Sequence, residues 1–289
     1  MTIGEALAES KALLSGAGIE NPALDADLLL AHALGVNRSA LVAARRDSDA
    51  LNPEALERFR AFIERRRSGE CVAYILEKKE FFGLEFFVNK NVLVPRPDTE
   101  CLVEAALSRL AGKKTPNLRA LDLCAGSGAI AIALKSQRPD LEAWATDISQ
   151  GALEVAKINA ACLLPLGAVH FRLGDLFQAL SAGDARAFDL ITANAPYVPA
   201  GEIPGLSAEV RGEPILALDG GADGLDIIRK IVAQAPRFLL PGGSLMLEAD
   251  PRQMPAIALM LESAGLEPGG AIKDLSGRDR ALEAFQKGD

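Results

Sequence analysis

The first 75 residues place apolar side chains at three- and four-residue spacing, the pattern of helices that bury one face. Thr2 and Glu5 match a capping box, in which two side chains bond the free amides at a helix start. A second helical stretch opens at Pro22 and runs to Gly35, and a third begins at Asn52-Pro53 and ends near residue 69. The pattern predicts a small helical bundle over residues 1–75.

Between Tyr74 and Val94 the pattern changes to aromatic and β-branched residues around Gly83, which predicts a β-hairpin linker over residues 76–95. We expect the linker's aromatic side chains to pack rather than to bind a ligand. From Leu118 onward, apolar strand-like runs alternate with helical stretches, as a parallel sheet with right-handed crossovers requires. Residues 96–289 are therefore predicted to form a doubly wound, Rossmann-like α/β domain.

A glycine turn follows the first strand of this domain, in the run LDLCAGSGAIA that ends at Ala131. Gly126, Gly128 and Ala131 fit G-x-G-x-x-G/A, in which glycine lets the backbone lie close to a ligand. Asp147 ends the next strand, at the spacing of a ribose-binding carboxylate. The pattern is typical of a nucleotide-cofactor site, although NAD enzymes share it and a purely structural turn has the same sequence.

Two further turns close predicted strands. Asp175 and Leu176 follow the strand 168–172, where a carboxylate can accept a hydrogen bond from the adenine amine and an apolar side chain can cover the ring. The run Asn194-Ala-Pro-Tyr197 follows the strand 188–193. The Asn194 side-chain oxygen and the Ala195 carbonyl can each accept from a planar NH2 group, on which the Tyr197 ring can stack. These turns lie at the sheet edge where open α/β folds bind ligands.

Together these segments resemble the S-adenosylmethionine-dependent methyltransferases, and more narrowly the protein-(glutamine-N5) methyltransferases of the HemK/PrmC family, which modify peptide-chain release factors. Four further segments are similar to blocks of that family, so the resemblance covers almost the whole chain: 92–100 (VLVPRPDTE), 209–214 (EVRGEP), 217–225 (ALDGGADGL) and 274–279 (DLSGRD).

The resemblance implies an S-adenosylmethionine cofactor, released as S-adenosylhomocysteine, and a substrate glutamine in the Gly-Gly-Gln segment of class 1 release factors. It also implies that the N-terminal bundle docks the substrate and that the last strand runs antiparallel. The cofactor contacts that it carries over are Cys124, Ala125, Gly126, Ser127, Gly128, Asp147, Asp175, Leu176 and Asn194. The residues that it assigns to the substrate glutamine are Asn194, Ala195, Pro196 and Tyr197.

The chain departs from the family at three places: Ala195 replaces the first proline of Asn-Pro-Pro-Tyr, Cys124 replaces a frequent glycine, and residues 248–250 read Glu-Ala-Asp where Glu-Ile-Gly is frequent. Without that proline Asn194 is less restricted, so the turn is less preorganised. This change leaves open a cofactor-binding relative without turnover. A glutamine methyltransferase of a large-subunit ribosomal protein also stays open, because enzymes of that group share the turn and often carry the Asp-Leu-Cys start seen at residues 122–124.

Composition narrows the class of partner. A net charge of −8 and a pI near 5.0 disfavour a protein that grips nucleic-acid phosphates, which weighs against DNA adenine methyltransferases. No apolar run approaches the roughly 20 residues of a membrane span, so we expect a cytoplasmic protein, and we expect a monomer. The four cysteines show no C-x-x-C spacing, and with two histidines a metal site is not expected. The basic cluster from Arg58 to Arg67 is either a solvated helix face or a docking surface for an acidic partner.

Overall fold

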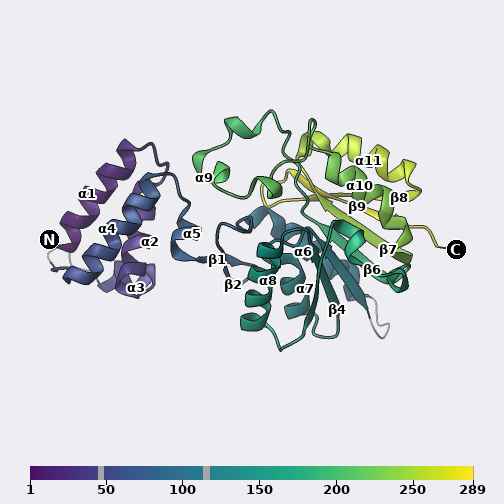
Figure 1. The fold of residues 1–289 in the computed structure, drawn as a ribbon, viewed down its shortest axis with the longest axis horizontal. Helices are drawn as coiled ribbons and strands as arrows, with labels where there is room; N and C mark the ends of the chain where they lie inside the picture. The colour runs from purple at the N-terminus through teal and green to yellow at the C-terminus, as the bar shows by residue number, and fades with distance from the viewer. Residues whose placement is uncertain (45–48, 113–117, 289) are drawn as a thin grey trace. The chain divides into compact units, whose positions relative to one another are not determined.

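A computed structural model describes residues 1–44, 49–112 and 118–288, which divide into two compact units (Figure 1). The first comprises Met1–Lys78 together with Ser207–Gly212, and the second comprises Lys79–Leu206 and Glu213–Asp289. No helix within the described ranges is long and apolar enough to cross a lipid bilayer.

The first unit is helical, as the sequence predicts. Its helices are α1 (Ile3–Gly16), α2 (Pro22–Leu34), α3 (Arg38–Ala44), α4 (Pro53–Arg67), α5 (Val72–Leu76) and the short α9 (Ala208–Arg211). The Thr2 and Glu5 capping box is present, and Gly35 ends α2 in the left-handed conformation that glycine tolerates. Leu14, Leu29 and Phe59 are among the side chains that fill the core of the bundle.

Most arginines of the basic cluster on α4 form ion pairs inside this unit. Arg66 is only 2% exposed and forms ion pairs with Asp25 and with Glu209 of α9. The other charged pairs of the cluster are Arg58 with Glu54, Arg65 with Glu70 and Arg67 with Glu64. Because Arg66 lies in a buried ion pair, it holds α9 against the bundle rather than offering its charge to a partner.

The second unit begins with the predicted hairpin, formed by β1 (Lys78–Phe81) and β2 (Leu84–Phe87). A short 3₁₀ turn, η1 (Pro97–Thr99), then leads into α6 (Glu100–Ala111). A seven-stranded sheet follows in the order β5-β4-β3-β6-β7-β9-β8, which confirms the predicted fold class. Its strands are β3 (Arg119–Leu123), β4 (Glu142–Asp147), β5 (Val169–Leu173), β6 (Phe188–Ala193), β7 (Leu239–Glu248), β8 (Leu266–Lys273) and β9 (Asp279–Gln286).

Strands β5, β4, β3, β6 and β7 pair in parallel, whereas β9 runs antiparallel to both of its neighbours, as the resemblance implies. The crossover helices are α7 (Ala129–Gln137), α8 (Gln150–Leu163), α10 (Asp226–Gln234) and α11 (Met254–Ser263). The strand order reverses direction at β3, so right-handed crossovers place α7 and α8 on one face of the sheet and α10 on the other (Figure 1).

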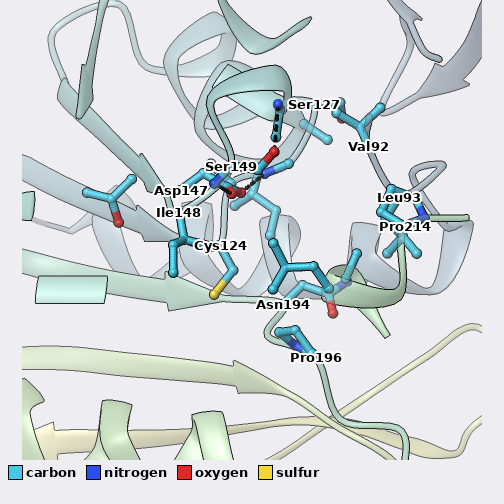
Figure 2. A pocket seen from close by; sticks show the side chains of 18 of the residues that line it. Val92, Leu93, Cys124, Ser127, Asp147, Ile148, Ser149, Asn194, Pro196 and Pro214 are labelled. Atoms are coloured by element: carbon cyan, nitrogen blue, oxygen red, sulfur yellow. Dashed lines mark hydrogen bonds between the residues drawn. The ribbon is translucent and has the colours of Figure 1, made fainter. Parts of the chain in front are cut away.

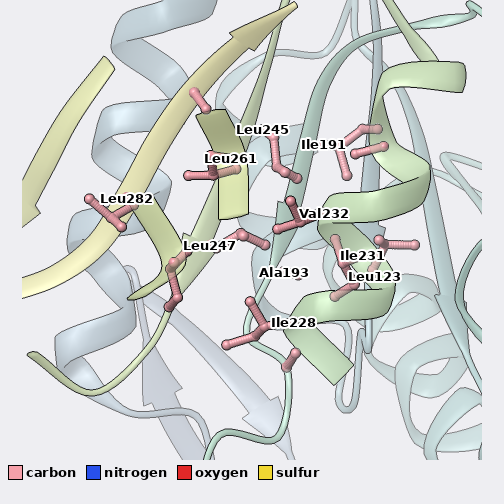
Figure 3. Close-up of a cluster of buried hydrophobic side chains, with 14 of the residues drawn as sticks. Leu123, Ile191, Ala193, Ile228, Ile231, Val232, Leu245, Leu247, Leu261 and Leu282 are labelled. Carbon is pink, nitrogen blue, oxygen red and sulfur yellow. The ribbon is translucent and has the colours of Figure 1, made fainter. Parts of the chain in front are cut away.

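Buried side chains of β3, β6 and β7 pack against α10 and α11 in the larger core (Figure 3). Ile191, Leu245 and Ile231 are each fully buried there. The strand β7 starts five residues earlier than the run 244–248 suggests, because Leu239 pairs with Phe188 before a bulge in the register. This core fixes the strand ends from which the candidate site is built.

Candidate active site

A cavity of about 340 Å³ opens at the carboxyl ends of β3, β4 and β6, at the point where the strand order reverses (Figure 2). All of its lining residues belong to the second unit. The residues of the sequence-predicted site that line it are Cys124, Ala125, Gly126, Ser127, Asp147, Asp175, Leu176, Asn194 and Pro196. Gly128, Ala195 and Tyr197 are not part of its wall.

The glycine turn after β3 uses its two glycines differently. Both have positive φ, 55° at Gly126 and 80° at Gly128. The space beside Gly126 is open, so a ligand can approach its backbone closely. A Cβ atom at Gly128 would lie 2.9 Å from Ile132 Cδ1 and 3.2 Å from Ala156 Cβ, so this glycine is needed for packing between α7 and α8.

Cys124 also has positive φ, 56°, although it is not glycine. An L side chain pays a steric cost in this region, which explains in physical terms why glycine suits the position. The Cys124 thiol faces the cavity (Figure 2), and burial together with neighbouring carboxylates raises its pKa. The thiol is therefore neutral and acts as an apolar part of the wall.

Asp147 ends β4 and is tied to the glycine turn. Its Oδ2 accepts a 2.8 Å hydrogen bond from the Gly126 amide, and its Oδ1 accepts one of 2.8 Å from the Ser149 amide (Figure 2). Burial raises the pKa of this carboxyl, while the backbone amides act in the opposite direction. Each carboxylate oxygen has a second lone pair, so Asp147 can still accept from a ligand hydroxyl in the cavity.

The Asn194 side chain is held from one side. Its Nδ2 donates a 3.1 Å hydrogen bond to Thr99 Oγ1, so the assigned orientation leaves Oδ1 available to the cavity. Ala195 is 2% exposed, and its amide has no protein acceptor within the described part of the chain. The backbone carbonyl of Tyr197 accepts a 2.9 Å bond from Gln253 Nε2, and burial raises the pKa of the Tyr197 phenol to about 12.

The segment between the hairpin and α6 also forms part of the cavity wall, a role that sequence reasoning did not assign to it. Val92, Leu93 and Arg96 line the cavity. The segment is anchored by Glu213, which accepts from the Val94 amide at 3.1 Å and pairs with Arg96 at 2.5 Å. Family blocks flagged residues 92–100 and 209–214, but only the fold brings the two together.

A second missed residue, Asn159 of α8, connects the hairpin to the glycine turn. It is 1% exposed, its Oδ1 accepts from the Phe87 amide at 2.7 Å, and its Nδ2 donates to the Ser127 carbonyl at 2.9 Å. Phe81 of the hairpin also lines the cavity, where the sequence suggested packing alone.

Known proteins with similar sequences show which family has this site. The family model of the PrmC N-terminal domain matches residues 5–76, and that of a methyltransferase domain matches residues 114–264. The release factor glutamine methyltransferase of Cereibacter sphaeroides is 41% identical over 285 residues, 98% of each chain. The enzyme of the same name from Deinococcus radiodurans is 40% identical over 288 residues, the whole of both chains.

This chain belongs to the release factor glutamine methyltransferase family. The family predicted from the sequence is therefore confirmed, and the relatives found give no support to the ribosomal-protein alternative. A solved methyltransferase from Pyrococcus furiosus shares the fold, with a TM-score of 0.51 at 18% identity, over 79% of this chain and 98% of that one. The chain thus joins a PrmC-type N-terminal domain to a methyltransferase domain.

Proposed function

We propose that this protein transfers a methyl group from S-adenosylmethionine to the side-chain amide nitrogen of a glutamine in the Gly-Gly-Gln segment of class 1 release factors. The observation that carries the proposal is the Asn194 amide, whose Nδ2 is engaged by Thr99 while its Oδ1 is left to the wall of the cavity. An acceptor at this place suits the NH2 group of a glutamine.

The cavity wall fits S-adenosylmethionine, which supplies an electrophilic methyl group when bound. The open side of Gly126 allows backbone approach, and Asp147 offers acceptor lone pairs for ribose hydroxyls. Asp175 and Leu176 line the neighbouring wall, where they suit an adenine amine and ring face.

Asn194 and Ala195 would activate the glutamine by orienting it. An amide nitrogen is a poor nucleophile because its lone pair is delocalised into the carbonyl. Acceptors that hold both N–H bonds favour positive charge on nitrogen as the N–C bond forms and the C–S bond breaks. The Asn194 Oδ1, in the cavity wall, would be one acceptor, and the carbonyl of Ala195, the next residue and just outside that wall, would be the other; the nitrogen then loses one proton to water. Tyr197 closes this turn outside the cavity wall, and its hydroxyl faces Glu248.

The proposal is tested by incubating the protein with labelled S-adenosylmethionine and purified release factor. Mass spectrometry should find one added methyl group on the glutamine of the Gly-Gly-Gln segment. A release factor with that glutamine replaced by alanine is the control and should gain no label. Methylation of a ribosomal protein or of DNA adenine in its place, or cofactor binding without any transfer, would refute the proposed substrate.

We predict that Asp147→Asn weakens S-adenosylmethionine binding by about 1–3 kcal/mol, the range for hydrogen bonds to a charged group. Asparagine keeps one acceptor for the Gly126 or Ser149 amide, so the fold should persist. Calorimetric titration measures the affinity. Asp140→Asn, at a surface carboxylate outside the cavity wall, is the matched control. Equal affinities in the two variants would show that Asp147 does not contact the cofactor.

We also predict that Ala195→Pro raises kcat by about tenfold or less. Proline would remove no protein hydrogen bond, because the Ala195 amide has no acceptor among the described residues. Proline would restrict both its own backbone and that of Asn194. The gain should stay within tenfold, because a tenfold change in rate needs about 1.4 kcal/mol of activation free energy and the entropic effect of one proline is smaller. Steady-state kinetics beside cofactor titration checks this. A slower variant, or one with altered S-adenosylmethionine affinity, would mean that the turn is built differently.

A further inference from the structure

Three polar side chains from separate segments meet behind the Asn194 turn. Ala193 of β6 pairs with Leu247 of β7, so Asn194 and Glu248 each follow by one residue on adjacent parallel strands and share a face of the sheet. Thr99 reaches the same place from the start of α6. Thr99 is 4% exposed and Glu248 only 1%, so solvent does not supply their partners.

Burying the Glu248 carboxylate at this place does not stabilise the fold. It faces the hydroxyls of Thr99 and Tyr197, the two donors that stabilise its charge. Its Oε2 atom is buried and has no hydrogen-bond partner among the residues that the structure describes. A buried carboxylate with an unsatisfied oxygen costs free energy, so its presence at this strand end calls for another reason.

The direction of the hydrogen bonds between Glu248, Thr99 and Asn194 supplies that reason. A threonine hydroxyl has a single proton to donate. When Glu248 is ionised it can only accept, so Thr99 directs its proton to the carboxylate and can only accept from Asn194. The Asn194 group that faces Thr99 must then be Nδ2, as the 3.1 Å contact from Nδ2 to Oγ1 has it.

We propose that Glu248, acting through the Thr99 hydroxyl, fixes the orientation of the Asn194 amide so that Oδ1 faces the cavity. Thr99 and Glu248 are thus positioning residues. The inference rests on the proposed function, in which Asn194 Oδ1 accepts from the substrate amide. With the amide reversed, Asn194 would present its own NH2 to the NH2 of the glutamine, and the two donors would repel.

Protonation of Glu248 releases this constraint. A neutral carboxyl can donate to Thr99, whose proton is then free to point at Asn194 Oδ1 and stabilise the reversed amide. Burial raises the pKa of Glu248 to about 7, within the working range of a cell. The orientation of Asn194 should therefore depend on pH near neutrality, with the productive form favoured as pH rises through this value.

Several groups around Glu248 set where this transition falls. Arg280 of β9 favours the ionised carboxylate and lowers its pKa, whereas Asp98 of η1 raises it. The Cys101 thiol on α6 is neutral, because burial and the nearby Glu248 charge raise its pKa to about 11. Arg280 is itself paired with Asp98 at 2.5 Å, so the negative charge of Asp98 offsets part of the effect of Arg280 on the pKa of Glu248.

The test compares Thr99→Val, which removes the hydroxyl at nearly constant shape, with Thr99→Ser, which retains it. We expect Thr99→Val to lower kcat about 10- to 100-fold with little change in S-adenosylmethionine affinity, and Thr99→Ser to recover most of the rate. Thr192→Val is the matched control. It removes the buried hydroxyl that donates to another carboxylate, Asp122. Neither residue lines the cavity, so the variant should have a lower melting temperature without a lower kcat.

The pH profile of kcat gives a second and independent measurement. In the parent, kcat should fall below about pH 7. In Glu248→Gln this inflection should disappear, because the glutamine amide does not titrate and its NH2 can donate to Thr99. Thr99→Val with a kcat like the parent, or an unchanged inflection in Glu248→Gln, would overturn the inference. The proposed function fails separately, if Asn194→Ala itself retains full activity.

Discussion

Replacing Asn194 with alanine should lower kcat about 10²–10³-fold, the range found when one preorganised group that stabilises developing charge is removed. The variant lacks the acceptor that orients the substrate amide, and water is a poor substitute in a cavity lined by Leu93, Ile130 and Leu176. Single-turnover methylation of the release factor, at saturating cofactor, measures the effect on methyl transfer itself.

Two measurements separate this result from general damage. The S-adenosylmethionine affinity of Asn194→Ala should fall far less than its rate, because Asp147 and the glycine turn are intact. Its melting temperature should stay close to the parent's, since the lost contact with Thr99 is one partly buried hydrogen bond. A rate within a factor of about two of the parent would mean that Asn194 does not hold the substrate.

Replacing Gly224 with alanine should destabilise the protein by about 3 kcal/mol or more and lower its activity as well. Gly224 has φ of 78°, and a Cβ atom there would overlap the Tyr197 carbonyl oxygen and Gln253 Nε2. Those two atoms form the 2.9 Å hydrogen bond that holds the end of the Asn194 turn. The estimate combines left-handed strain, overpacking and the lost hydrogen bond.

Gly201→Ala is the control for this prediction, because no atom lies within 4 Å of a Cβ added at Gly201 and its φ is not in the left-handed region. Thermal unfolding of both variants is the measurement, and Gly224→Ala should melt on the order of 10 °C lower. Equal melting temperatures would show that the 217–225 segment does not clamp Tyr197. Full activity in a destabilised Gly224→Ala would show that the clamp serves stability alone.

The sequence by itself determined the elements and the order of the ligand-binding turns. Helix starts at Thr2 and Pro22 depend on capping and on proline geometry, which act within one turn of the chain. The turns after β3, β4 and β6 could be placed at one edge because consecutive parallel strands deliver their carboxyl ends together. The lining residues Gly126, Asp147, Asp175, Leu176 and Asn194 were therefore predictable from the pattern, whereas the others from these turns were implied by the family resemblance.

Only the tertiary structure decided which groups support those turns. Thr99 meets Asn194 across 95 residues of sequence, and Arg96 meets Glu213 across 117. No local pattern specifies such pairs, because their proximity depends on the strand order of the sheet and on how α6 packs over it. The structure also assigned Gly128 to helix packing, and it moved Tyr197 out of the cavity wall. Strand order and turn spacing thus predict residues that line the cavity, whereas the long-range packing of the sheet decides how those residues are held.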